Sequence, residues 1–173
     1  MDLDFVRPDL RAIDRSAADV VACSLWEDIR PMGGLAALVD FRLAGRLSQF
    51  AARGELQGSM GEALLYPPRP KLAQEKLVVF GLGSSKAFDD EAYERAIVRV
   101  LRTLGGLGAR RAVLELPGRG GDAIAPERAA ELLFSAYAAE ESSLHLYVVE
   151  EEEAKRRILA RIQDEKKRAR RVV

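Results

Sequence analysis

The sequence predicts a three-layer α/β/α domain built on a mixed, mostly parallel sheet. Residues 76–104 have the pattern of a buried strand, a glycine turn and an amphipathic helix in immediate succession. Further strand-like runs alternate with helical patterns along most of the chain, which is typical of a parallel sheet covered by helices on both faces. One pair of strand-like runs is joined by a loop too short for a crossover helix, so we expect that pair to be antiparallel.

The strand–turn–helix unit is the clearest part of this prediction. Residues 77–80 form a short apolar run rich in β-branched side chains, which favours a strand buried on both faces. Gly81 and Gly83 let the backbone turn, and Asp89 is a good N-cap for the helix that follows. Gly105 and Gly106 should end this helix. Its buried face is predicted from apolar residues at helical spacing, namely Tyr93, Ile97, Val100, Leu101 and Leu104.

The elements before this unit are two strands, one helix and a third strand. Residues 3–6 are a weak strand candidate, and residues 18–26 are a stronger one because their centre is apolar and β-branched. Helical periodicity then covers residues 35–52. Residues 58–66 and 77–80 are strand-like and are separated by a short, proline-rich loop, PPRPKLAQE. These two runs should therefore pair antiparallel.

The elements after the unit continue the alternation. Residues 111–116 predict a strand, and the next helix has Pro126 at a plausible first position. Residues 143–149 predict the last strand, and residues 150–170 predict the last helix. We divide the chain into an α/β domain at residues 1–150 and a charged C-terminal helix at residues 151–173, which either belongs to the same domain or forms an interface.

Length and composition are those of an ordinary globular protein. The 173 residues suffice for one domain, and 48% of them are hydrophobic and 31% charged. The 27 basic residues balance the 27 acidic ones, so global charge predicts no nucleic-acid or membrane partner. Cys23 is the only cysteine, which excludes an intrachain disulfide and fits a reducing cytoplasm. The charged N-terminal stretch has no apolar core of signal-peptide length, so we predict a cytoplasmic protein.

Candidate ligand-binding residues lie in the loops that follow two of the parallel strands. The carboxyl ends of parallel strands are where α/β sheets bind ligands. Backbone N–H groups and hydroxyls there could hold an anion, and Arg119 could clamp a carboxylate or phosphate. The alternative is that both loops are plain connections, since acidic residues open the helix after the first loop and would repel phosphate. The candidates are Gly81, Gly83, Ser84, Ser85, Gly118, Arg119, Gly120 and Gly121.

We predict no catalytic residue, no metal ligand and no cofactor. His145 is the only histidine, and neither a metal site nor a catalytic relay has the other residues that it needs. A packed or surface role is the expectation for this side chain. Ser84 and Ser85 lack the G-x-S-x-G setting of an activated serine nucleophile.

The C-terminal helix begins with glutamates and continues with many lysines and arginines, a distribution that suits the helix dipole. It could be a solvated helix, or its basic end could contact nucleic acid. Its apolar seam, formed by Ile158, Leu159 and Ile162, is too narrow for a deeply buried helix. We therefore predict that these three residues contribute to an interface, most simply in a homodimer.

Several phrases of the sequence together resemble the N-terminal domain of the cytosol leucyl aminopeptidase family. They are DVVACSLWED, GRLSQFAARGELQGSMGEALLY, KLVVFGLGSSKAFDDEAYERA and AAELLFSAYAAEESSLHLYVVEEEEA, and the match extends over about residues 3–160. The resemblance implies a macro-domain-like α/β sandwich. In that family the two-metal peptidase site lies in a separate C-terminal domain with an NTDAEGR motif, which this sequence lacks. No family catalytic or metal residue can be carried over.

The resemblance implies one of three functions. The first is a stand-alone, non-catalytic module of protein association or regulation, with itself or a full-length aminopeptidase as partner. The second is a small-ligand module of macro-domain type, for a nucleotide or an ADP-ribose-like ligand. Cys23 and Trp26 weaken this alternative, because they stand where ligand-binding macro domains carry asparagines. The third is a peptidase family member that acts only with a separate catalytic chain.

Overall fold

The computed structural model describes residues 2–171, with side chains described through residue 164, and it contains one six-stranded sheet of order β1-β6-β5-β2-β4-β3. All neighbouring strands are parallel except β3 and β4. The predicted mixed, mostly parallel sheet and its one antiparallel pair are therefore confirmed. The strands are β1 (Asp2–Val6), β2 (Val20–Leu25), β3 (Ala63–Tyr66), β4 (Lys76–Gly81), β5 (Arg111–Leu114) and β6 (His145–Val149).

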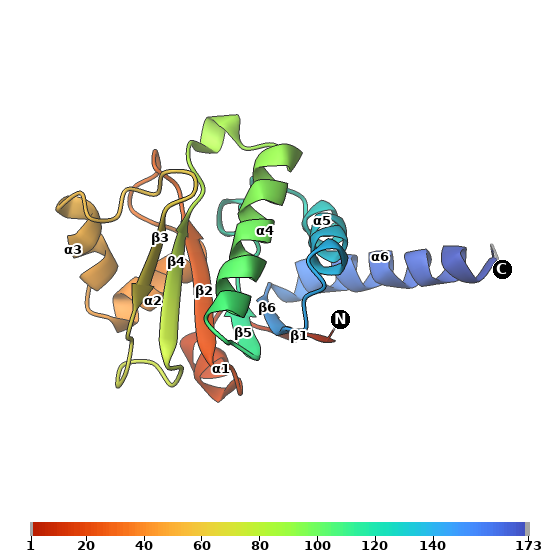
Figure 1. Cartoon of the computed structure of the whole chain (residues 1–173), viewed down its shortest axis with the longest axis horizontal. Coiled ribbons are helices and arrows are strands. Elements are labelled where there is room, and N and C mark those ends of the chain that lie inside the picture. The colour runs from red at the N-terminus through yellow and green to blue at the C-terminus, as the bar shows by residue number, and fades with distance from the viewer. Residues whose placement is uncertain (1, 172–173) are drawn as a thin grey trace.

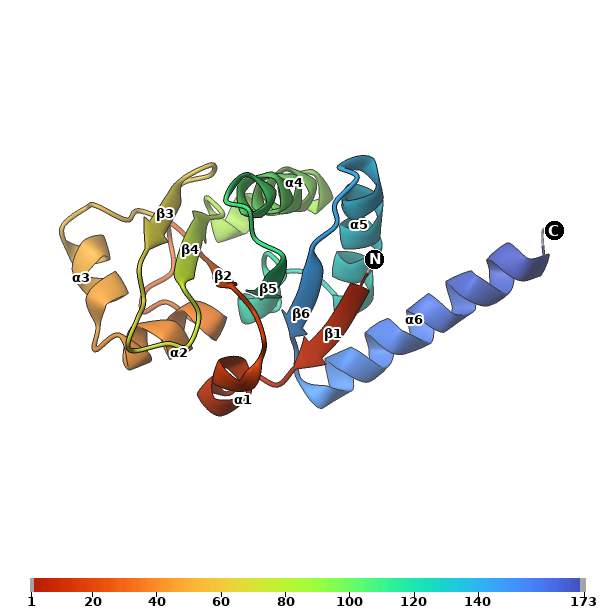
Figure 2. The ribbon, with the colours of Figure 1, turned by 60° about the horizontal axis from the view of Figure 1, so that its bottom comes forward.

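Helices cover both faces of this sheet, so the predicted three-layer architecture is also confirmed. Helices α4 and α5 lie on one face, and the short helices α1, α2 and α3 lie on the other (Figures 1 and 2). Two short 3₁₀ turns, η1 (Ser85–Ala87) and η2 (Arg119–Gly121), follow β4 and β5. The helices are α1 (Leu10–Arg15), α2 (Gly34–Arg42), α3 (Arg46–Ala52), α4 (Asp90–Gly106), α5 (Pro126–Ala139) and α6 (Glu152–Arg171).

The central strand β2 is buried on both faces, as its apolar centre predicted. Val20 and Ala22 belong to the core beneath α4 and α5, whereas Val21 and Cys23 belong to the core against α1, α2 and α3. This alternation follows from the two-residue period of a strand. The centre of the sheet is therefore a rigid platform, and the loops at its carboxyl edge can be positioned precisely.

Helix α4 follows the prediction closely. The Asp89 side chain accepts a hydrogen bond from Ala92 N at 2.8 Å, which makes it the N-cap. All five residues of the predicted apolar face are buried. The Tyr93 hydroxyl also donates to the carbonyl of Ala129 at 2.7 Å, and this bond fastens α4 to α5.

The single helix expected at residues 35–52 is wrong, because the chain forms α2 and α3 instead. Ala44 and Gly45 have φ values of 55° and 78°, which no α-helix continues through. The buried carboxylate of Asp40 accepts hydrogen bonds from Leu47 N at 2.7 Å and Ser48 N at 3.1 Å, so it caps the start of α3. A carboxylate within α2 therefore caps the start of α3.

Two further differences concern the first half of the chain. Helix α1 was not predicted; Asp9 caps it by accepting from Ala12 N at 2.8 Å, and Ile13 anchors it in the core. Strand β3 is shorter than the predicted residues 58–66, because Gly58 and Gly61 have positive φ and form a turn.

Helix α6 packs against α5 near its start and then leaves the body of the domain. Ala154 and Ile158 are buried, and Ile158 is only 1% exposed. Figure 2 shows the C-terminal half of the helix extending away from every other element. Among the residues that the structure describes, no helix is long and apolar enough to cross a membrane.

Candidate functional site

A cavity of about 60 Å³ lies at the carboxyl ends of β2, β4 and β5. The helices that follow β2 cover one face of the sheet, whereas those that follow β4 and β5 cover the other (Figure 1). The connections diverge at this point, and such a divergence is where open α/β sheets form their crevice. The cavity is thus in the position where the sequence led us to expect a ligand.

The side chain of Glu115 forms the charged part of the cavity wall. Glu115 directly follows β5, is 8% exposed, and accepts a hydrogen bond from Leu35 N at 2.8 Å. Leu35 lies in the first turn of α2, so the carboxyl group caps the positive end of that helix. An added methyl group at Gly34 would lie 2.4 Å from Glu115 Oε1, and one at Gly120 would lie 2.7 Å from Oε2. The two glycines therefore provide the space that the carboxyl group fills.

Burial raises the pKa of Glu115 from 4.5 to about 7. The hydrogen bond from Leu35 opposes this change because it favours the charged form. The negative charge of Glu150 raises the pKa further, and the positive charge of Arg119 lowers it. Near neutral pH the cavity therefore contains a carboxyl group that exchanges between its neutral and charged forms.

Trp26 forms another part of the cavity wall and is held in place from several sides. Its ring packs edge to face on Phe88, with ring centroids 4.8 Å apart. The Arg30 guanidinium donates to the carbonyl of Trp26 and, at 2.9 Å, to the carbonyl of Gln57. An added methyl group at Gly121 would lie 3.4 Å from Trp26 Nε1. The indole is therefore a fixed wall rather than a mobile cover.

The three glycines predicted as ligand-binding residues in the second loop do line this cavity. Gly120 lies against the Glu115 carboxyl group, Gly121 against the Trp26 indole and Gly118 against the Phe88 ring. Gly118 has φ 78°, and an added methyl group there would lie 2.6 Å from the ring of Phe88. The glycines thus permit close packing around a small space, and their role in binding a ligand remains a prediction.

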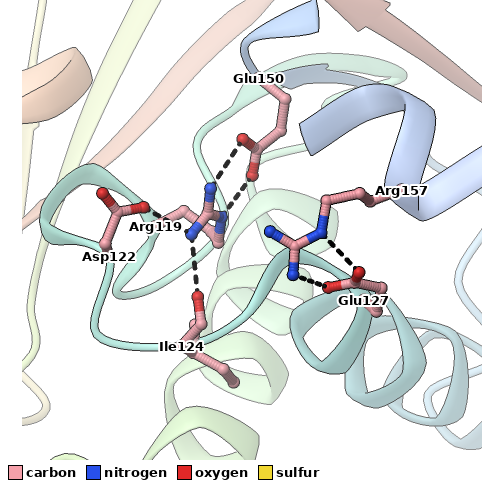
Figure 3. A network of polar contacts seen from close by, with 6 residues as sticks. All are labelled: Arg119, Asp122, Ile124, Glu127, Glu150 and Arg157. Carbon is pink, nitrogen blue, oxygen red and sulfur yellow. Dashed lines mark hydrogen bonds and ion pairs between the residues drawn. The ribbon is translucent and has the colours of Figure 1, made fainter. Parts of the chain in front are cut away.

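Arg119, from the same loop, points to a different set of partners (Figure 3). Its Nε donates to Glu150 Oε1 at 2.7 Å, and its Nη1 donates to Asp122 Oδ1 and to the carbonyl of Ile124, both at 2.9 Å. Burial by itself lowers the pKa of Arg119, but the bonds to Glu150 and Asp122 raise it overall. In this structure the guanidinium fastens the loop to the end of β6 instead of opening toward the cavity.

The first predicted loop also directs its polar groups elsewhere. The hydroxyls of Ser84 and Ser85 both donate to Asp28 Oδ2 at 3.0 Å, and Ser85 N donates to Asp28 Oδ1 at 2.9 Å. The hydrogen bond from Ser85 N contributes most to lowering the pKa of Asp28, and the bonds from the two hydroxyls lower it further. Gly81 and Gly83 pack against residues 58–60. An added methyl group at Gly81 would collide with the backbone there, at 2.1 Å from the carbonyl oxygen of Ser59, and one at Gly83 would lie 3.2 Å from Met60 Cβ. Leu82, between them, is the residue of this loop that lines the cavity.

His145 lies at the β1 edge of the sheet, away from the cavity. Its Nε2 lies 2.9 Å from Asp4 Oδ2, and its ring stacks on that of Tyr147 with centroids 4.7 Å apart. Among the side chains that the structure describes, those of residues 2–164, no three from His, Cys, Asp or Glu are grouped so that they could hold a metal ion.

The predicted interface residues of α6 have different surroundings. Ile158 is buried within the domain, Leu159 is 38% exposed, and Ile162 is partly buried. Whether they contact another molecule remains a prediction. The structure adds that the exposed part of this seam is centred on Leu159.

Residues 20–156 match the model of the cytosol aminopeptidase family, N-terminal domain. The chain belongs to this family. Two relatives are the probable cytosol aminopeptidase of Pseudomonas fluorescens strain Pf0-1 and the cytosol aminopeptidase of Pseudomonas aeruginosa strain PAO1. The first is 34% identical over 87 residues, which cover 50% of this chain and 18% of the relative. The second is 34% identical over 102 residues, which cover 57% of this chain and 21% of the relative. The chain thus matches about a fifth of these relatives.

Solved structures show the same fold for this aminopeptidase N-terminal domain. A mutant macrodomain from Oceanobacillus iheyensis has a TM-score of 0.71 at 13% identity and covers 96% of this chain and 93% of its own. The macrodomain of Mycobacterium tuberculosis DarG has a TM-score of 0.63 at 14% identity, and the match covers 86% of this chain and 97% of the macrodomain. A tomato leucine aminopeptidase mutant has a TM-score of 0.61 at 17% identity, with 92% and 35% covered. The predicted macro-domain-like fold is confirmed.

Sequence reasoning missed Glu115 and the cavity role of Trp26. A signal for Glu115 was present, because it is the only charged residue between Arg111 and Leu116 in the strand-like run RAVLEL. A charged residue at the end of a buried strand requires a compensating partner. That partner, the N-terminus of α2, comes from a segment 80 residues earlier, and no local pattern predicts the contact.

Proposed function

We propose that this aminopeptidase N-terminal domain acts by protein association, that its partner is a second copy of the same domain, and that the two copies meet along α6. The observation that supports this most is the extension of α6 beyond the body of the domain (Figure 2). The 20 residues of the helix span roughly 30 Å. Isolated helices shorter than about 12–15 residues are marginal in water, so the half of α6 that extends from the domain is best explained by a contact that stabilises it.

The two ends of α6 are chemically complementary. Glu151, Glu152 and Glu153 are exposed at its start, and the sequence after Lys155 is strongly basic. If two copies of the helix ran antiparallel, the acidic start of each copy would lie near the basic end of the other copy. Leu159 would provide an apolar contact near the middle. A two-fold arrangement of this kind is the commonest closed assembly.

The alternative of a nucleotide or ADP-ribose-like ligand has less support. Sites for drug-sized ligands measure roughly 300–1,000 Å³, whereas the cavity at the carboxyl edge measures about 60 Å³. The carboxyl group of Glu115 also lies in its wall, and its charged form would repel a diphosphate. Protein association is therefore the function that we propose.

The test is the molar mass of the full chain and of a chain truncated after Gln163, measured by light scattering. This truncation leaves the buried residues Ala154 and Ile158 in place, whereas truncation at the start of α6 would uncover the core. We expect the full chain to be a dimer at high micromolar concentration and the truncated chain to be a monomer with an unchanged circular dichroism spectrum.

The control is Phe41→Ala, which removes a large apolar side chain on α2 that is 78% exposed. We expect this variant to remain dimeric. A dimer that persists after truncation would show that the interface lies outside the removed part of α6. A full chain that is monomeric, but co-elutes with a full-length cytosol aminopeptidase, would replace self-association with a heterologous partner.

A further inference from the structure

The cavity at the carboxyl edge combines one ionisable group with apolar walls. Glu115 is the only residue with a charged side chain among those that line it. Opposite are side chains that are apolar over most of their surface, namely Leu25, Trp26, Ile29, Met32 and Leu82. A space with an acidic end and an apolar wall favours a ligand with a cationic head and a short apolar body.

The carboxyl group of Glu115 has unused capacity to accept hydrogen bonds. Its one donor among the described hydrogen bonds is Leu35 N, whereas a carboxylate has about four acceptor positions. Arg119, in the loop that follows Glu115, directs its guanidinium to Glu150 (Figure 3). The cavity therefore contains a buried acceptor, and no side chain that the structure describes forms an ion pair with it.

We infer that this cavity binds a small primary alkylammonium ion, whose N–H groups donate to the Glu115 carboxylate and whose alkyl carbons contact the apolar wall. A metal ion such as calcium takes six to eight oxygen ligands, and the cavity has a single carboxylate. Its volume of about 60 Å³ is less than half of the roughly 150 Å³ cavity known to hold benzene. Methylammonium and ethylammonium are thus the appropriate probes.

Binding of such a cation should depend on pH. The ion binds the charged form of Glu115, and burial raises the pKa of this group to about 7. The titratable or charged neighbours are Arg119 and Glu150, which are paired with each other, and Cys23, whose thiol has a pKa raised by burial. From pH 6 to pH 8 the charged fraction of Glu115 increases about tenfold, and the affinity should increase by the same factor.

The intrinsic fluorescence of the protein gives a direct readout, because Trp26 is the only tryptophan in the chain. We would titrate the full chain with methylammonium and ethylammonium chloride at pH 8, with sodium chloride at equal ionic strength as the reference. Tetramethylammonium is the matched probe, since it has the same charge without an N–H donor. We expect saturable changes with the two primary ions alone.

The matched variants are Glu115→Gln and Glu91→Gln. Glutamine at position 115 can still accept from Leu35 N but has no charge, and Glu91 is an exposed residue in the first turn of α4. We expect at least a tenfold loss of affinity in the first variant and no change in the second. Equal binding of tetramethylammonium, or unchanged binding by Glu115→Gln, would overturn the proposal.

A measurement on the unmodified protein covers the case in which Glu115→Gln does not fold. Carboxyl ¹³C resonances of the full chain report the titration of Glu115 directly, and saturating ethylammonium should lower its pKa. An unchanged titration curve together with unsaturable fluorescence would mean that the cavity holds water alone.

Discussion

Two ion pairs near the start of α6 have almost the same geometry but very different surroundings (Figure 3). Arg119 meets Glu150 with Nε–Oε1 and Nη2–Oε2 distances of 2.7 and 3.2 Å. Arg157 meets Glu127 with distances of 2.6 and 2.8 Å between the same atoms. The side chains of the first pair are 10% and 5% exposed, and those of the second are 49% and 31% exposed.

This difference in burial decides what each pair contributes. Breaking a buried pair leaves one charge in a poorly solvating environment, whereas water replaces the partner of an exposed charge. The buried pair joins the loop after β5 to the end of β6, where Glu150 N also donates to the carbonyl of Val6 at 3.1 Å. The exposed pair joins α5 to α6. Similar contacts in Figure 3 should therefore have unequal effects on stability.

The largest effect is expected for Arg119→Met, which leaves Glu150 buried without its cation. The free energy of unfolding should decrease by about 3–5 kcal/mol, as measured by urea denaturation. The double variant Arg119→Met, Glu150→Met should recover most of this loss, since two apolar side chains of similar volume can replace a buried pair. A loss below about 1 kcal/mol in the single variant would mean that water reaches Glu150.

The next effect separates apolar burial from ion pairing in α6. Ile158 is 1% exposed, so Ile158→Ala should lower the free energy of unfolding by about 2–4 kcal/mol through the cavity that it leaves. Phe41→Ala is the control, because Phe41 is 78% exposed and lies on α2, outside the proposed α6 interface. If both variants had equally small effects in urea denaturation, the contact between α5 and α6 would not depend on this apolar anchor.

A third carboxyl group, that of Glu115, extends the comparison, because it is buried and has a helix N-terminus as its partner instead of an arginine. Its pKa of about 7 in the folded protein lies above the value of 4.5 expected on unfolding. The folded state therefore retains the proton in this range, and its stability decreases as pH rises from 4.5 through 7.

Glu115→Gln should remove that pH dependence. Relative to the unmodified protein, the variant should gain about 2 kcal/mol between pH 5.5 and pH 7.5, from a slope of about 1.4 kcal/mol per pH unit. Urea denaturation at the two pH values measures the gain, with Glu91→Gln as the exposed control. A difference between variant and unmodified protein that does not change with pH would contradict the raised pKa.

The sequence predicted local features of this domain well and contacts between distant segments poorly. The strand–turn–helix unit was recognised because its strand, N-cap and apolar face lie within 30 residues. The break at Ala44 is an exception, because it was missed although its signals are local: Gly45 has a positive φ, and Asp40 accepts from Leu47 N only seven residues later. By contrast, the cavity depends on Glu115 meeting α2 across 80 residues. The glycine turn after the central strand could be predicted, because freedom of φ is a property of glycine itself.

The smallest effect is expected for Arg157→Ala, although its bonds to Glu127, at 2.6 and 2.8 Å, are about as short as those between Arg119 and Glu150 (Figure 3). The bond from Arg157 lowers the pKa of Glu127, but both side chains are partly open to water, which solvates each charge once the other is gone. We expect the urea midpoint to change by a small fraction of the change in Ile158→Ala, and this small difference should shrink further in high salt. A loss comparable with that of Arg119→Met would show that bidentate geometry, rather than burial, determines the strength of ion pairs in this domain.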